Sequence, residues 1–232
     1  HVSAVMKDAA TYEHIQPERV GNRQRVLLSD LSGRGNVTYK LKQLGLKDDL
    51  PEHSRREILE RIKQMEHQGY DFEAAEGTFE LLVREVMEPN FHPFHVVGYE
   101  VSTKLEGDET VTSASVTLRV GEAVHSSIAT GNGPVHALDV CLRKCLAPVY
   151  PAITDVRLTD YKVRVLGAKG GTESKVRVLV EWSDHQRSWT TAGISDNVID
   201  ASWRALVDAL RLELTRLIET RNPAERDYSW AV

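Results

Sequence analysis

Apolar positions follow a helical period in the first part of the chain and an alternating, strand-like period in the rest. Residues 52–67 place apolar side chains along one face with charges elsewhere, which predicts a helix, and a second helix is expected over about 72–87. The segment EPNFHPF at 88–94 contains two prolines, which do not continue a helix. We therefore place a domain boundary there.

Beyond this boundary, alternation predicts strands over about residues 97–103 and 114–120, with a third, shorter strand over about 123–129. From Pro134 onward the apolar residues return to helical spacing, and a proline is well tolerated in the first turn of a helix. The predicted order is therefore strand, strand, strand, helix.

The same order recurs about 62 to 64 residues later. YEVSTKL at 99–105 is echoed by YKVRVLG at 161–167, SASVTLRV at 113–120 by SKVRVLVEW at 174–182, and SSIATGNGPVHALDVCL at 126–142 by TTAGISDNVIDASWRAL at 190–206. Internal self-similarity of this kind is a fold-level signal. It predicts an α+β fold of two βββα repeats with pseudo-twofold symmetry, in which helices cover one face of each three-stranded sheet.

These patterns divide the chain into four segments. We expect a linker subdomain at 1–36, a helical linker subdomain at 37–92, a domain at 93–217 with repeats at about 94–150 and 156–217, and a frayed polar tail at 218–232.

Composition excludes several classes of function. The net charge of −5 gives no basic surplus for nucleic acid, and no apolar run approaches the roughly 18 residues that cross a membrane. The first residues do not form a secretory leader, so we expect a cytoplasmic protein. Cys141 and Cys145 share one helix face without further ligands nearby, and we interpret them as small core residues. Because the chain starts at His1 rather than methionine, we expect a longer protein to extend upstream.

The stretch TGNGPVHAL at 130–138 joins the third strand to the helix and resembles an anion-binding loop. It lacks the Lys-Ser/Thr pair of a nucleoside-triphosphate loop, and His136 stands where the dinucleotide motif G-x-G-x-x-G needs glycine. Pro134 also removes one of the backbone amides that would bind a phosphate, so a phosphate-binding loop is disfavoured. Two interpretations stay open. The glycines supply positive φ for the turn, or they let a ligand or another chain approach the backbone, where the remaining helix-start amides can hold a carboxylate.

Six segments in order closely resemble the C-terminal part of the isopropylmalate/citramalate synthase family, from His1 to about Leu214. They are HVSAV, TYEHIQPERVGNRQRVLLSDLSGRGN, GYDFEAAEGTFELL, TGNGPVHALDVCLRKCL, LTDYKVRVL and WTTAGISDNVIDASWRALVDAL. The third and fifth look more like the citramalate synthase branch than the leucine-pathway branch.

The resemblance implies an acyltransferase that condenses acetyl-CoA with a 2-oxo acid, pyruvate in the citramalate branch. Catalysis in this family takes place in an N-terminal TIM barrel with a divalent metal, and this chain contains neither the barrel nor its metal ligands. What remains is the linker and a regulatory domain that binds the end-product amino acid, isoleucine or leucine, in a homodimer. No cofactor is expected in this chain.

The resemblance also implies functional residues. His1 and Tyr12 match a histidine and a tyrosine that reach the partner subunit's catalytic site, where an imidazole and a phenol can donate protons to a developing oxyanion. The residues that match the amino-acid pocket are Gly131, Asn132, Gly133, Val135, His136, Leu158, Tyr161, Val165 and Ile194. Ordinary packing remains the alternative for Tyr161 and Val165.

Two other functions remain open at this stage. The chain can be the regulatory region of a 2-isopropylmalate synthase that senses leucine, or a stand-alone amino-acid-binding regulator that never had a barrel.

Overall fold

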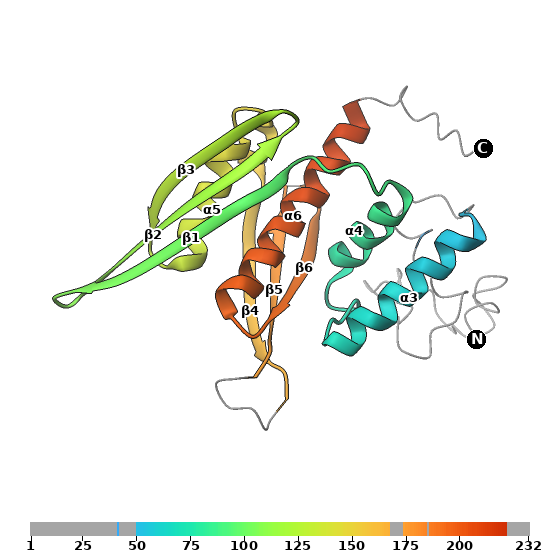
Figure 1. Ribbon diagram of the computed structural model, residues 1–232, viewed down its shortest axis with the longest axis horizontal. Helices are drawn as coiled ribbons and strands as arrows, with labels where there is room; N and C mark the ends of the chain where they lie inside the picture. Colours follow the sequence, from blue (N-terminus) through green and yellow to red (C-terminus); the bar gives the residue numbers. More distant parts are fainter. Residues whose placement is uncertain (1–40, 42–49, 168–173, 185, 222–232) are drawn as a thin grey trace, which may run out of the picture. The chain divides into compact units, whose positions relative to one another are not determined.

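A computed structural model describes residues 41, 50–167, 174–184 and 186–221 (Figure 1). The chain divides into two compact units, residues 1–68 and 69–232. His1 and Tyr12 lie outside the described residues. In the first unit, the predicted helix at 52–67 is confirmed as α3 (Glu52–Gln68), whose buried Ile58 and Ile62 lie one turn apart.

The second unit contains two three-stranded antiparallel sheets, with strand orders β1-β2-β3 and β4-β5-β6. Its elements are α4 (Glu76–Met87), β1 (His95–Glu106), β2 (Glu109–Val120), β3 (Ala123–Gly131), α5 (Pro134–Leu146), the 3-10 helix η3 (Pro151–Asp155), β4 (Arg157–Val165), β5 (Val176–Ser183), β6 (Ser188–Ser195) and α6 (Val198–Arg221). Each sheet is followed by its own helix, so the predicted α+β fold of two βββα repeats is confirmed. The described residues form no barrel.

Alternation along the central strands explains how each sheet meets its helix. On β2, alternate residues such as Val116 and Leu118 are buried, and on β5 alternate residues such as Val180 and Trp182 are buried. Helix α5 packs on β2 and β3, α6 packs on β5 and β6, and the two helices touch each other. One continuous apolar cluster therefore runs through both repeats, and it includes the buried Cys141 and Cys145.

A glycine near the end of the third strand of each repeat, β3 and β6, allows the helix that follows to approach its sheet. A Cβ added at Gly131 would lie 2.5 Å from the Ala137 nitrogen, and one added at Gly193 would lie 2.0 Å from the Ala201 carbonyl oxygen. Neither glycine has a positive φ, and Gly133 is extended with φ −177°. The interpretation that these glycines supply positive φ is therefore wrong, and close approach is the reason for Gly131 and Gly193.

Helix α4 belongs to the same compact unit as the two sheets. This unit begins at Gly69, upstream of the boundary expected at residue 93. Within it, α4 packs against β6 and α6, and α6 continues to Arg221, past the helical end expected near residue 217. None of the helices that the structure describes is long and apolar enough to cross a membrane.

Candidate functional site

The glycine-rich turn lies between the end of β3 and the start of α5. The Asn132 backbone amide donates to His136 Nδ1 at 3.1 Å, which holds the exposed imidazole over the turn and requires that nitrogen to be unprotonated. Helix α5 begins at Pro134, and its N-cap residue, Gly133, makes no side-chain capping bond. The first turn of α5 therefore leaves backbone amides without a cap.

The equivalent turn of the second repeat closes its own helix. Asn197 Oδ1 accepts a hydrogen bond from the Ile199 amide at 2.8 Å, and Ser195 Oγ accepts one from the Asn197 amide at 3.2 Å. An Asn side chain in this position is a common helix cap. The two repeats therefore differ at this turn: α6 is capped by its own chain, whereas the uncapped start of α5 can receive a carboxylate from outside.

Three predicted pocket residues lie on β4, an edge strand. Leu158 pairs with Trp182, Tyr161 with Val180 and Val165 with Val176, so all three face the same side of the sheet as α6. Unlike residues of the core, these three side chains are partly exposed to solvent.

Leu158 is 36% exposed and Val165 is 59% exposed, and Val163 between them is 47% exposed. These aliphatic side chains form an open apolar strip along β4. Such a strip can receive an aliphatic side chain from a ligand or from another chain.

Ile194 lies on the opposite side of the sheet. Its neighbour Gly193 faces α6, so Ile194 points to the other face of the sheet. On that face Ile194 is buried next to Gly69. The structure therefore does not bring Ile194 together with Tyr161 and Val165. Among the residues described, no hydrogen bond or ion pair joins the Gly131–His136 turn to β4.

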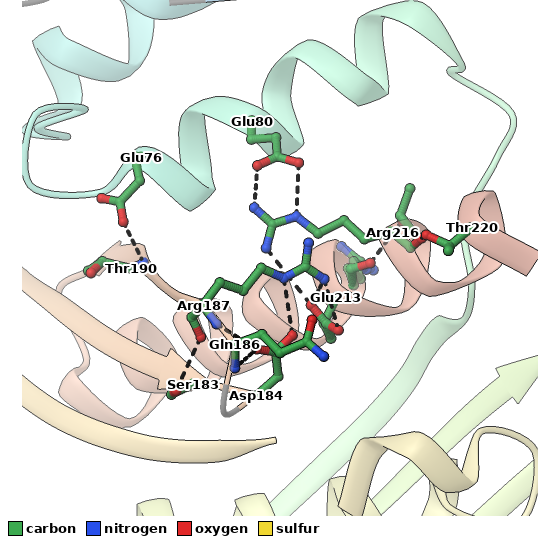
Figure 2. A network of polar contacts seen from close by, with 12 residues as sticks. Glu76, Glu80, Ser183, Asp184, Gln186, Arg187, Thr190, Glu213, Arg216 and Thr220 are labelled. Carbon is green, nitrogen blue, oxygen red and sulfur yellow. Dashed lines mark hydrogen bonds and ion pairs between the residues drawn. The ribbon is translucent and has the colours of Figure 1, made fainter. Parts of the chain in front are cut away.

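Side chains from the first turn of α4 cover part of the free edge of β6. The Thr190 amide donates to Glu76 Oε1 at 3.3 Å (Figure 2). The Ala192 amide donates to Thr78 Oγ1 at 2.8 Å. Two alternate edge amides thus have side-chain partners, which blocks this part of the edge from pairing with another strand.

A buried charge network fixes α4 to α6. Glu80, 4% exposed at its side chain, accepts a bidentate bond from Arg216, with Nε to Oε1 at 2.9 Å (Figure 2). It also binds Arg84, one turn along α4. Arg84 in turn pairs with Glu219 of α6. Burial alone would raise the pKa of Glu80, but the bonds and charges of Arg216 and Arg84 outweigh burial and lower it.

The network continues to the β5–β6 turn. Glu213, 2% exposed at its side chain, accepts from Arg187 Nη2 at 3.0 and 3.2 Å. The guanidinium groups of Arg187 and Arg216 lie 6.0 and 5.4 Å from the ring centre of Trp189. Burial raises the pKa of Glu213 despite these two arginines, because removing the carboxylate from water destabilises its ionised form.

Several of these residues carry no recognisable signal in the sequence. Glu80 and Arg216 are 136 positions apart, and each would pass for an ordinary surface charge on its helix. Asn197 is the exception, because an Asn directly before a helix is a sequence signal for an N-cap. No group of three or more His, Cys, Asp or Glu is placed to hold a metal ion within the described part of the chain.

Comparisons with known proteins agree with this architecture. Residues 73–213 match the LeuA allosteric (dimerisation) domain, and residues 1–70 match the homocitrate synthase post-HMGL domain-like family. The first match begins near the start of α4, as the compact unit does.

The chain is also similar to full-length enzymes. It is 45% identical over 216 residues to an (R)-citramalate synthase of Geobacter sulfurreducens and 42% identical over 218 residues to one of Aquifex aeolicus, covering 92% and 93% of this chain. It is 28% identical over 218 residues, 93% of this chain, to a 2-isopropylmalate synthase of Methanocaldococcus jannaschii. The chain spans about two fifths of the length of these relatives: 41%, 41% and 40%. With two βββα repeats on one core and a match over more than half of its residues, the chain belongs to the LeuA allosteric (dimerisation) domain family.

Proposed function

We propose that this chain is the regulatory portion of an (R)-citramalate synthase, an acyltransferase that condenses acetyl-CoA with pyruvate. The observation that carries the proposal is the 45% identity to a citramalate synthase, which extends over 92% of the chain, together with the two-repeat fold. The chain alone is expected to be catalytically inactive, because the barrel and its divalent metal would belong to a part of the protein outside this sequence. The pathway served would be isoleucine biosynthesis.

The proposed effector is isoleucine, bound as a feedback inhibitor. An aliphatic amino acid needs an anion site for its carboxylate and an apolar surface for its side chain. The uncapped start of α5, next to Val135, supplies the first requirement, and the exposed strip of β4 supplies the second. The self-capped start of α6 supports one carboxylate site per chain rather than two.

A second copy of the chain is the proposed means of completing the site. The α5 start and the β4 strip lie in different repeats, and the family is described as a dimerisation domain. In a homodimer, the turn of one protomer can meet β4 of its partner. His1 and Tyr12 are proposed to act in the partner's catalytic site, where an imidazole and a phenol would stabilise charge on the oxo-acid oxygen.

The alternative effector is leucine, as the regulator of a 2-isopropylmalate synthase. The similarity to the Methanocaldococcus jannaschii enzyme favours this candidate, although its identity of 28% is lower than the 45% of the citramalate synthase. A stand-alone amino-acid regulator is the third candidate.

A thermal melt with each amino acid separates the effectors. A ligand at 100 times its Kd stabilises the folded state by about 2.7 kcal/mol. We expect isoleucine to raise the midpoint more than leucine at equal concentration, with D-isoleucine as the matched control. A larger shift with leucine would transfer the chain to the leucine-sensing candidate.

A further inference from the structure

The proton positions around Tyr161 follow from its contacts with α6. Ser202 Oγ donates to the Val198 carbonyl oxygen at 2.5 Å, and a carbonyl can only accept. A serine hydroxyl has one proton, so this bond uses it. The Tyr161 hydroxyl lies 2.7 Å from Ser202 Oγ, and the tyrosine must therefore be the donor in that contact.

This arrangement fixes what the Tyr161 oxygen can do next. Its proton points to Ser202, whose side chain is fully buried, so its remaining capacity is to accept a hydrogen bond. Tyr161 stands on the same face of β4 as the exposed Leu158 and Val165. A polar group that binds this strip beside the phenol must be a donor.

The first repeat shows a different arrangement at the equivalent position. Tyr99, the counterpart of Tyr161, packs its ring on Trp203 with centroids 4.8 Å apart. The two tyrosines thus meet neighbouring residues of α6, Tyr99 through its ring and Tyr161 through its hydroxyl. Ring packing, as seen for Tyr99, is sufficient for a purely structural contact between a strand and α6. Such a contact does not require the two hydrogen bonds of the second repeat, from Tyr161 to Ser202 and from Ser202 to the Val198 carbonyl.

We propose that Ser202 is a positioning residue that commits the Tyr161 phenol to accept a hydrogen bond from the α-ammonium group of the bound amino acid. The inference rests on the proposed function, because it takes an amino acid as the ligand of β4. It adds a criterion of specificity: the site selects for a free amine, and Ser202 sets that selection without touching the ligand.

The test compares two ligands on the full chain by calorimetry: isoleucine and 3-methylpentanoate, which keeps the carboxylate and the aliphatic chain but lacks the amine. A hydrogen bond to a charged group contributes roughly 1.5–3 kcal/mol. We expect Ser202→Ala and Tyr161→Phe each to weaken isoleucine binding at least tenfold and to leave the Kd of 3-methylpentanoate unchanged. Ser202→Thr, which retains the hydroxyl, should restore isoleucine affinity.

The outcomes separate this inference from the proposal beneath it. Equal weakening of both ligands by Ser202→Ala would show a structural contact and overturn the positioning role, while the proposed effector stands. Wild-type chain that binds neither isoleucine nor leucine would overturn the proposed function and the inference together. A melting midpoint measured for each variant identifies any loss of binding that comes from unfolding, and the Ser202→Thr variant then decides the question.

Discussion

Replacing Glu80 with glutamine tests the buried network that holds α4 on α6. The substitution keeps the size of the side chain and removes its charge. Arg216 and Arg84, both 13% exposed at their side chains, would then face a neutral amide. Glu80 is the shared acceptor of both guanidinium groups, so one change affects both pairs.

The expected cost follows from burial. Removing one partner of a buried ion pair typically costs 3–5 kcal/mol, because the other charge is left without compensation. Arg84 keeps its bond to Glu219, and glutamine still accepts one hydrogen bond, so we expect the lower end, about 3 kcal/mol. For a chain of this size that loss corresponds to a fall in the melting midpoint of roughly 6–12 °C.

Urea and thermal unfolding followed by tryptophan fluorescence measure this cost, because Trp182, Trp189 and Trp203 all lie in the second unit. The matched control is Asp200→Asn, which breaks a more exposed pair on α6, that of Asp200 and Arg204, and should change stability by less than about 1 kcal/mol. A Glu80→Gln cost no larger than that of the control would refute the reasoning.

The pH dependence gives an independent check on the same residue. Because the folded pKa of Glu80 lies below its ordinary value of 4.5, its stabilisation is present above pH 4.5 and is lost as the pH falls through the folded pKa. The difference in unfolding free energy between wild type and Glu80→Gln should therefore be constant near neutral pH and shrink in acid. A difference that grows in acid would contradict the account.

Two further predictions concern the packing and titration of the second unit. Gly193→Ala should prevent normal folding, because the new Cβ would overlap the Ala201 carbonyl. The control, Gly98→Ala, adds a Cβ that meets nothing within 4 Å and should leave the melting midpoint nearly unchanged. Equal melting midpoints for the two variants would contradict the close approach of α6 to Gly193. Burial raises the pKa of Asp208 to about 7, against the opposing charge of Arg211. The folded state therefore binds the Asp208 proton more tightly than the unfolded state does, and the free energy of unfolding should fall as the pH rises from about 4 to about 7. In Asp208→Asn that slope should be reduced by up to about 1.4 kcal/mol per pH unit, and an unchanged slope would assign it to another group.

The repeat architecture was accessible from the sequence because each strand and helix has a local pattern. Alternation at 114–120 and helical spacing after Pro134 reflect faces that are buried by the nearest elements, and the second copy provided an independent reading of the same order. Gly131 was also recognisable as part of a special turn. Its reason, contact with the first turn of α5, needed coordinates, since a glycine allows both positive φ and close approach.

The placement of α4 and the composition of the site depend on contacts between distant residues. Prolines at 88–94 suggested a boundary, yet α4 packs across that segment onto β6 and α6, through pairs such as Thr78 and Ala192, 114 positions apart. Ile194 was matched to the pocket by its position in a motif, and a strand places neighbouring residues on opposite faces. Only the register showed that Ile194 faces away from Tyr161.

The central claim is that the two-repeat domain binds isoleucine, and calorimetry on the full chain tests it most directly. The account predicts saturable binding of isoleucine with a lower Kd than leucine, and loss of that binding when Val165→Asp places a charge on the β4 strip. Absence of heat with millimolar isoleucine, or tighter binding of leucine, would contradict it.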